Sequence, residues 1–184
     1  MKKIFISMIC LLTVSMCFFS SCKKDDSNQE EIGDVVASGE ETTETYVDLG
    51  LPSGTKWKTE NEKNADDPNH DLFNHYVAIA QFGKQVPNTQ QWSELIDNCV
   101  FTWTDNGCNV TGPNGKSIFL PAAGIMFADG DFIGEGYGYY WTYNTYSSNT
   151  KRAYEVRFDG LTLPPRIDGY GLRECKLSVR LVCL

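Results

Sequence analysis

The sequence predicts an α+β domain that consists mainly of antiparallel strands, with one or two helices and long loops. Residues 46–184 contain all nine tyrosines, all four tryptophans and seven of the ten phenylalanines, which is enough for one hydrophobic core. Short apolar segments in this region are separated by Gly, Pro and Asn, as in strands that are joined by turns. One segment has the period of an amphipathic helix, and strands and helices do not alternate as they would in a doubly wound sheet.

A helix is expected over residues 87–99. Its apolar residues occur at positions i, i+3, i+4 and i+7: Trp92, Leu95, Ile96 and Cys99. Asn88 precedes the first turn, and Gln91 is placed to complete a capping box with it. The spacing therefore predicts a helix with a defined start and one apolar stripe.

The remaining elements are expected to be strands. The predicted strands are residues 46–51, 76–82, 100–104, 109–111, 117–120, 139–143 and 153–158. Residues 112–116 (Gly-Pro-Asn-Gly-Lys) predict a hairpin turn between two of them. In the closing strand, residues 177–183, apolar residues alternate with Ser178 and Arg180, which predicts one apolar and one polar face. Because residues 76–82 contain two alanines, a helix is the alternative there.

The first 21 residues have the three parts of a secretory signal peptide: a basic start, an apolar run and small residues at the end. The apolar run is shorter than a membrane span requires. The ending Phe-Phe-Ser-Ser-Cys resembles a bacterial lipobox, and this resemblance implies cleavage after residue 21 and lipid attachment to Cys22. Several acyl chains on one cysteine anchor a protein stably. The alternative is an ordinary signal peptide that is followed by a cysteine by chance.

Residues 22–45 are expected to comprise the lipidated cysteine and an acidic, flexible linker. After Cys22 this segment contains eight acidic residues, two lysines and no aromatic residue. Its start, Lys-Lys-Asp-Asp, resembles the surface-export signal of some outer-membrane lipoproteins. We therefore expect an outer-membrane lipoprotein, exposed on the bacterial surface and attached to the membrane by its lipid anchor. The net charge of −8 argues against nucleic acid as a partner.

Four cysteines remain in the predicted domain: Cys99, Cys108, Cys175 and Cys183. Four cysteines in an exported domain suggest two disulfides. We favour the pair Cys99–Cys183, which would join the helix end to the last strand, and the pair Cys108–Cys175. Zinc binding is less favoured, because no CxxC pair is present and the histidines are distant in the sequence. Free thiols are the third alternative.

Several sequence blocks resemble those of one protein family. They are YVDLGLPSGTKW (46–57), PNTQQWSEL (87–95), VTGPNG (110–115), SIFLPAAG (117–124), GYYWT (138–142) and SVRLV (178–182). Their order and composition are similar to those of the Fibrobacter succinogenes major paralogous domain family, which is common in bacterial surface lipoproteins. The resemblance covers residues 46–184. It implies a C-type-lectin-like fold, with the N- and C-terminal strands close together.

The sequence contains no familiar catalytic motif, and we predict a non-enzyme without a cofactor or metal. A calcium-dependent lectin site would need a carboxylate where Val86 stands before Pro87. The other candidates for ion binding or acid–base chemistry are polar residues in two segments: Asp129, Asp131 and Glu135 in one, His70 and His75 in the other. Both segments are more typical of solvated loops than of such sites.

The aromatic segment 137–146 contains the best candidates for ligand contact, because sugars stack on exposed aromatic rings. Tyr143, Asn144 and Tyr146 extend beyond the predicted strand toward a loop, and we predict that they bind the ligand. The favoured function is a non-catalytic binding module for a glycan or protein ligand. The alternatives are a structural or assembly component of a cell-envelope complex, and a degenerate enzyme that depends on Cys175.

Overall fold

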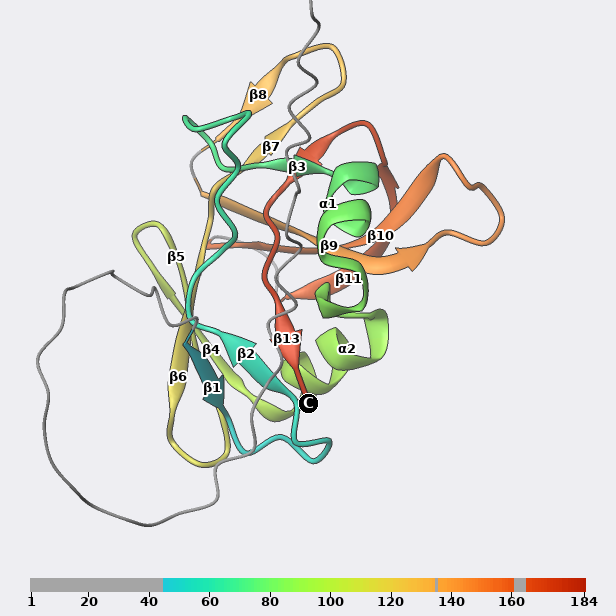
Figure 1. The fold of residues 1–184 in the computed structure, drawn as a ribbon. Helices are drawn as coiled ribbons and strands as arrows, with labels where there is room; N and C mark the ends of the chain where they lie inside the picture. The colour runs from blue at the N-terminus through green and yellow to red at the C-terminus, as the bar shows by residue number, and fades with distance from the viewer. Residues whose placement is uncertain (1–44, 135, 161–164) are drawn as a thin grey trace, which may run out of the picture. The chain divides into compact units, whose positions relative to one another are not determined.

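Antiparallel strands in four small sheets and two short α-helices make up the described part of the chain (Figure 1). This computed structural model describes residues 45–134, 136–160 and 165–184. The predicted α+β class is therefore confirmed. The helices are α1 (His75–Phe82), the 3-10 turn η1 (Gly83–Gln85) and α2 (Thr89–Asn98). The strands are β1 (Tyr46–Asp48), β2 (Lys56–Lys58), β3 (Phe73–Asn74), β4 (Val100–Thr104), β5 (Gly107–Thr111), β6 (Ser117–Pro121), β7 (Ile125–Met126), β8 (Phe132–Ile133), β9 (Tyr137–Thr145), β10 (Arg152–Asp159), β11 (Arg166–Leu172), β12 (Lys176–Leu177) and β13 (Val182–Cys183).

The first and last strands of the domain meet in one sheet, with the order β1-β2-β13. Strand β2 pairs antiparallel with β1 and with β13, so that Trp57 lies opposite both Val47 and Val182. Figure 1 shows β2 and β13 side by side. The expectation that the terminal strands lie close together is confirmed.

The predicted hairpin between β5 and β6 is also confirmed, and β4 completes its sheet. The turn closes where the backbone N–H of Gly112 donates to the carbonyl oxygen of Lys116 at 2.9 Å. A Cβ atom at Gly112 would lie 2.1 Å from the carbonyl oxygen of Leu49. Only glycine therefore allows the segment after β1 to approach this turn.

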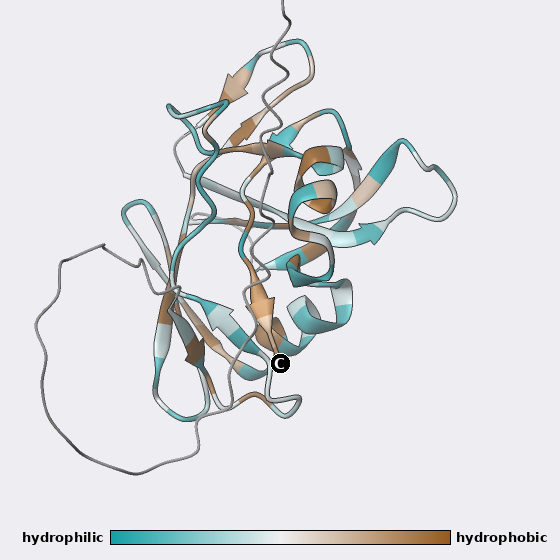
Figure 2. Ribbon diagram, viewed as in Figure 1, coloured by the Kyte–Doolittle hydropathy of each residue, from teal (hydrophilic) through white to brown (hydrophobic). Residues whose placement is uncertain are grey.

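Strand β9 lies between two hydrophobic clusters, because successive side chains of a strand point to opposite faces. Tyr140 packs in the first cluster with Trp57 and Trp92, and Trp141 packs in the second with Phe73. All five of these side chains are buried. Figure 2 shows hydrophobic residues on interior strands such as β13, while the loop that joins β9 to β10 is mostly hydrophilic. The two clusters thus share β9 as a common wall.

The prediction of a strand over residues 76–82 is wrong, and the helical alternative is correct, because these residues lie in α1. The Asn74 side chain accepts a hydrogen bond from the backbone N–H of Val77 at 2.9 Å and caps the first turn. Gly83 ends the helix with a φ of 54°. Ala78 packs into the second cluster, whereas Val77 is exposed. The helix therefore depends on its two caps and on one narrow buried face.

The alternation predicted over residues 177–183 is wrong as well. This segment forms two strands, β12 and β13, that belong to different sheets. Ser178 and Arg180, which were expected on a polar face, are each only 1% exposed. The backbone of Ser178 exchanges hydrogen bonds with β9, accepting from Trp141 N at 3.1 Å and donating to Tyr139 O at 3.0 Å. The segment is buried because it crosses the interior between the sheets.

The guanidinium group of Arg180 joins three separate parts of the chain. Its Nε donates to Asn61 Oδ1 at 2.9 Å, its Nη1 to the carbonyl oxygen of Lys58 at 2.7 Å and its Nη2 to that of Phe119 at 2.7 Å. Lys58 belongs to β2 and Phe119 to β6. One planar, multivalent donor therefore satisfies acceptors that have little access to water.

The expected disulfides Cys99–Cys183 and Cys108–Cys175 are not formed, since Cys99, Cys108 and Cys175 have free thiols. Cys108 packs in the first hydrophobic cluster and Cys175 in the second, so β9 separates them. Cys99 ends α2 and packs against the first cluster. Burial raises the pKa of Cys99 and of Cys108 to about 11. These cysteines act as small hydrophobic residues in the core.

Replacing Arg180 with lysine should lower the free energy of unfolding by about 3 kcal/mol, because one ammonium group cannot reach three partly buried acceptors on separate segments. Urea unfolding followed by tryptophan fluorescence measures the loss. Arg166→Lys is the control, since the Arg166 side chain is 39% exposed and makes one surface ion pair. Equal losses in the two variants would contradict the role assigned to Arg180.

Candidate functional site

An open groove of about 550 Å³ lies where the start of α2 meets the end of β9. It is lined by Lys84, Val86, Asn88, Thr89, Gln90, Gln91, Tyr143, Asn144 and Leu184. Its volume lies within the range of small-molecule sites. Two of the three predicted ligand-binding residues, Tyr143 and Asn144, therefore lie in the same groove.

The third predicted residue, Tyr146, does not line the groove. Its ring packs edge-on against Tyr154, with 5.6 Å between the ring centroids. Its backbone N–H donates to the carbonyl oxygen of Arg152 across the β9–β10 hairpin. The structure thus separates Tyr146 from Tyr143 and Asn144.

The start of α2 forms one wall of the groove, and its predicted capping box is confirmed. Asn88 Oδ1 accepts from the backbone N–H of Gln91 at 2.9 Å, and Gln91 Oε1 accepts from the backbone N–H of Asn88 at 2.9 Å. These bonds satisfy two of the N–H groups that a helix start leaves unpaired. Trp92 and Leu95 then anchor the helix in the first cluster, as the apolar stripe predicts.

The end of β9 forms the opposite wall and is bonded to the helix start. Asn144 Oδ1 accepts from the backbone N–H of Thr89 at 2.9 Å, and the backbone N–H of Tyr143 donates to Pro87 O at 2.8 Å. The two bonds join segments that are more than fifty residues apart in the sequence. They fix the width of the groove without help from a bound ligand.

Three amide side chains of the groove have their oxygen atoms occupied in this way: Asn88, Gln91 and Asn144. Rotating any of these amides by half a turn would break its bond to a backbone N–H, so each NH₂ group keeps its position. Within the described part of the chain, none of these NH₂ groups donates a hydrogen bond. The groove lining therefore contains three fixed NH₂ groups without a described partner.

Tyr143 adds an aromatic surface to these donors. It is half-buried, and it packs partly against the second hydrophobic cluster. Val86, next to it in the groove lining, is buried. The groove lining therefore combines an apolar ring with amide side chains from both walls. This combination suits a ligand that has both C–H faces and oxygen acceptors.

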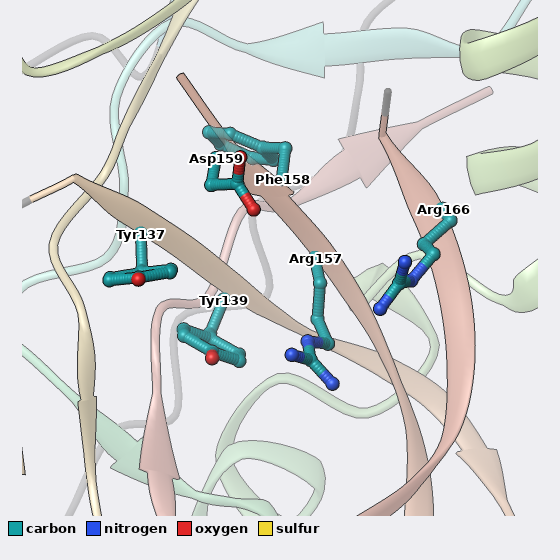
Figure 3. A pocket seen from close by; sticks show the side chains of 6 residues that line it. All are labelled: Tyr137, Tyr139, Arg157, Phe158, Asp159 and Arg166. Carbon is teal, nitrogen blue, oxygen red and sulfur yellow. The ribbon is translucent and has the colours of Figure 1, made fainter. Parts of the chain in front are cut away.

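A second, smaller pocket lies beside β9, β10 and β11, and Figure 3 shows its lining. Tyr137 and Tyr139 project side by side from β9, with Arg157 and Arg166 on the neighbouring strands. The guanidinium of Arg157 lies 5.3 Å from the ring centroid of Tyr139, and both arginines contact Asp168. The pocket volume is about 10 Å³, the space of a single water. These contacts stabilise the sheet and leave too little room for a ligand.

The two histidines of the chain, His70 and His75, lie in different surroundings. His70 Nδ1 lies 3.0 Å from Asp67 Oδ1, and Lys176 Nζ donates to Asp67 Oδ2 at 3.1 Å. Burial acts to raise the pKa of Asp67, but the hydrogen bonds from His70 and Lys176 lower it. The ring of His70 also packs on Phe132, with centroids 4.5 Å apart. This cluster joins a surface loop to β12 and β8.

His75 is fully buried at the start of α1. Its Nε2 donates to the carbonyl oxygen of Thr142 at 3.0 Å, and its Nδ1 accepts from Arg173 Nε at 3.0 Å. Burial lowers the pKa of His75 to about 4, and the positive charge of Arg173 acts in the same direction. The expectation of a polar loop at His75 is wrong, because the neutral ring is a bridge between α1 and β9.

Asp129 and Asp131, for which a solvated loop was favoured over an ion site, lie in the turn between β7 and β8, where Asp131 N donates to Asp129 Oδ1 at 3.2 Å. Glu135 and Cys22 lie outside the described residues, as do the predicted signal peptide and nearly all of the linker. Among the residues with a described position, no cluster of three His, Cys, Asp or Glu side chains is placed to hold a metal. The described helices are all too short or too polar to span a membrane.

Sequence reasoning did not assign Lys84, Thr89 and Gln90 to a site, and it assigned Gln91 only a capping role. The capping box was a local signal that could have placed the first turn of α2 at one surface. The approach of this turn to Asn144 is a tertiary contact, and no local pattern in the sequence indicates it. The predicted pair Tyr143 and Asn144 therefore identified one wall of the groove and missed the other.

No protein-family model matches this chain, and neither a curated protein nor a solved structure matches it.

The buried His75 should make the domain less stable in acid. Its pKa is about 4 in the folded chain and about 6.5 in an unfolded chain, so protonation favours unfolding. The contribution of His75 is complete above pH 6.5 and declines as the pH falls toward 4, by about 3 kcal/mol in total. Urea unfolding of the wild type and of His75→Gln at several pH values measures this loss.

Glutamine can donate to Thr142 and accept from Arg173 without titrating, which makes His75→Gln the matched control. Burial raises the pKa of Glu155 to about 7, and this group titrates in both proteins, so its effect cancels in the difference. The same decline in stability for wild type and variant between pH 6.5 and 4 would contradict the prediction.

Proposed function

We propose that this protein is an outer-membrane lipoprotein, exposed on the bacterial surface, whose domain is a non-catalytic binding module for a glycan. The groove between α2 and β9 is the observation that supports binding, because it combines Tyr143 with three oriented amide donors. The lipid anchor at Cys22 rests on the sequence, since this residue lies outside the described range.

A glycan suits the groove better than a purely apolar ligand does. Sugar rings present a face of C–H groups, which packs on an aromatic ring such as that of Tyr143, and a rim of oxygen atoms, which accepts from amide N–H groups. An apolar ligand would cover the donors of Asn88, Gln91 and Asn144 without pairing them, and unpaired buried donors are costly. The mixed lining therefore favours a polar ligand with flat apolar faces.

The non-catalytic role is supported by the surroundings of the groups that could do chemistry. His75 is bonded through both ring nitrogens, and neither nitrogen is available to a substrate. Cys175, the residue on which the degenerate-enzyme alternative depends, is buried in the second cluster, and burial raises the pKa of its thiol. A buried thiol with a raised pKa is a poor nucleophile.

We also propose that the domain belongs to the Fibrobacter succinogenes major paralogous domain family and has its C-type-lectin-like fold. Two observations support this proposal. The resembling blocks at the two ends of the domain contribute β2 and β13, which pair with each other. The resembling block at residues 87–95 contributes the first turns of α2, with its capping box.

A second candidate function is a structural or assembly component of a cell-envelope complex. The β7–β8 hairpin exposes three large apolar side chains, Phe127, Phe132 and Ile133, which are 37%, 43% and 46% exposed. Neighbouring exposed apolar residues of this kind occur at protein–protein contacts. This candidate places the contact on the hairpin, away from the residues that line the groove.

A glycan array probed with the full-length protein in detergent tests the proposed function. Tyr143→Ala should weaken binding about tenfold or more, because the ring supplies the apolar contact. Tyr146→Ala is the control and should bind normally, since Tyr146 does not line the groove. Absence of any glycan signal, together with an envelope protein whose co-purification depends on Phe132, would replace this proposal with the second candidate.

Cys22→Ser tests the lipid anchor. Serine cannot form the thioether to which the lipid is attached, so the variant should be released from membranes into the soluble fraction. Mass spectrometry of the wild-type protein should find acyl chains on Cys22 and no residues 1–21. An unacylated wild-type protein that begins at Met1 would contradict the proposed localisation.

A further inference from the structure

Three amide side chains that line the groove have hydrogen-bond donors without a partner among the described residues. The amide oxygens of Asn88, Gln91 and Asn144 each accept one backbone N–H, whereas their NH₂ groups have no partner among the described residues. A hydroxyl group both donates and accepts, whereas a carboxylate only accepts. The fixed amides of this groove carry NH₂ donors without a described partner, which favours a ligand group that is rich in acceptors.

The charged side chain in the groove also favours a ligand that is rich in acceptors. Among the described residues that line the groove, Lys84 is the one with a charged side chain, and no aspartate or glutamate side chain accompanies it there. Lys84 also forms no ion pair with any residue that the structure describes. Elsewhere the protein is acidic, with a net charge of −8, so a lysine that lines a groove without a described acidic side chain beside it is a local departure from the overall charge. An ammonium group beside neutral N–H donors selects for a negatively charged oxygen ligand.

The backbone N–H groups at the start of α2 do not account for this selectivity. The backbone N–H groups of Asn88, Thr89 and Gln91 are already bonded to side-chain oxygens. The donors that remain are side-chain groups from three separate elements: η1, the first turn of α2 and β9. An oxygen-rich anionic group can accept hydrogen bonds from all of them at once. A ring that carries this group could pack on Tyr143.

We propose that the groove binds an acidic glycan, in which the carboxylate of a uronic acid is bonded by Lys84 and the amide donors while its ring packs on Tyr143. This proposal rests on the proposed function and specifies the ligand class of the same site. A carboxylate supplies several acceptor positions and no donor, which complements the groups that the groove presents.

The test replaces the NH₂ donor of a groove amide with a carboxylate oxygen, which accepts, and leaves the size of the side chain almost unchanged. In Asn144→Asp one carboxylate oxygen can still accept from the backbone N–H of Thr89, but the NH₂ group becomes a negative oxygen. Gln91→Glu likewise preserves the capping box. Asn149→Asp is the control, because Asn149 Oδ1 accepts from Lys151 N in an exposed turn outside the groove. All three variants change the net charge by the same amount.

The measurement is calorimetric titration of the full-length protein in detergent. The probes are short oligosaccharides of glucuronic, galacturonic and mannuronic acid, each paired with the same chain after reduction of its carboxylates to alcohols. The wild type should bind at least one acidic chain about tenfold more tightly than the reduced chain. Asn144→Asp and Gln91→Glu should each weaken that binding about tenfold or more, and Asn149→Asp should not. Urea unfolding checks that all three variants remain folded.

The outcomes separate this proposal from the proposed function. Equal or tighter binding of the reduced, neutral chains would overturn the acidic ligand class and leave glycan binding in place. Equal effects of Asn144→Asp and Asn149→Asp would show that net charge, and not the groove, determines binding, and would also overturn it. Failure of every acidic and neutral chain to bind would overturn both proposals.

Discussion

The buried guanidinium of Arg180 is the interaction on which the arrangement of the domain depends. It lies between β12 and β13 and bonds β2, the segment after β2 and β6 at the same time. Each bond satisfies a partly buried acceptor on a different segment, so separating any one segment from the others breaks a charge-assisted hydrogen bond. The phenol of Tyr140 extends this network, accepting from Asn61 Nδ2 at 3.2 Å and donating to the carbonyl oxygen of Pro121 at 2.8 Å.

This network has a consequence for the groove. Tyr140 and Trp141 hold β9 between the two hydrophobic clusters, and the same strand continues to Tyr143 and Asn144. The position of the groove residues therefore follows from a buried part of the strand. On the other side, Trp92 fixes α2 in the first cluster. A site built on two anchored elements needs little reorganisation when a ligand binds, and this lowers the entropic cost of binding.

The sequence predicts local features well where a strong pattern and a cap coincide. The apolar stripe and the Asn88–Gln91 box correctly predict α2, and the turn residues correctly predict the β5–β6 hairpin. Two of the residues that line the groove, Tyr143 and Asn144, were singled out from the sequence because they belong to a recognisable aromatic strand.

The errors have a common physical cause, which is tertiary burial. Arg180 was expected on a polar face, since alternation does not show that a polar residue has buried partners. The disulfide pairs were inferred from the number of cysteines, and cysteine number does not reveal that Cys108 and Cys175 belong to different clusters. The helix α1 was ambiguous by composition, and its caps at Asn74 and Gly83 were the better signal. For Arg180 and for the cysteines, the missing information was which segments lie on either side of β9.

The most direct test of the account is nuclear magnetic resonance of the side-chain amides during titration with a glycan that the protein binds. The account predicts that the NH₂ signals of Asn88, Gln91 and Asn144 shift with one common affinity, while that of Asn149 stays in place. Unchanged signals for the three groove amides, with shifts confined to the β7–β8 hairpin, would contradict it.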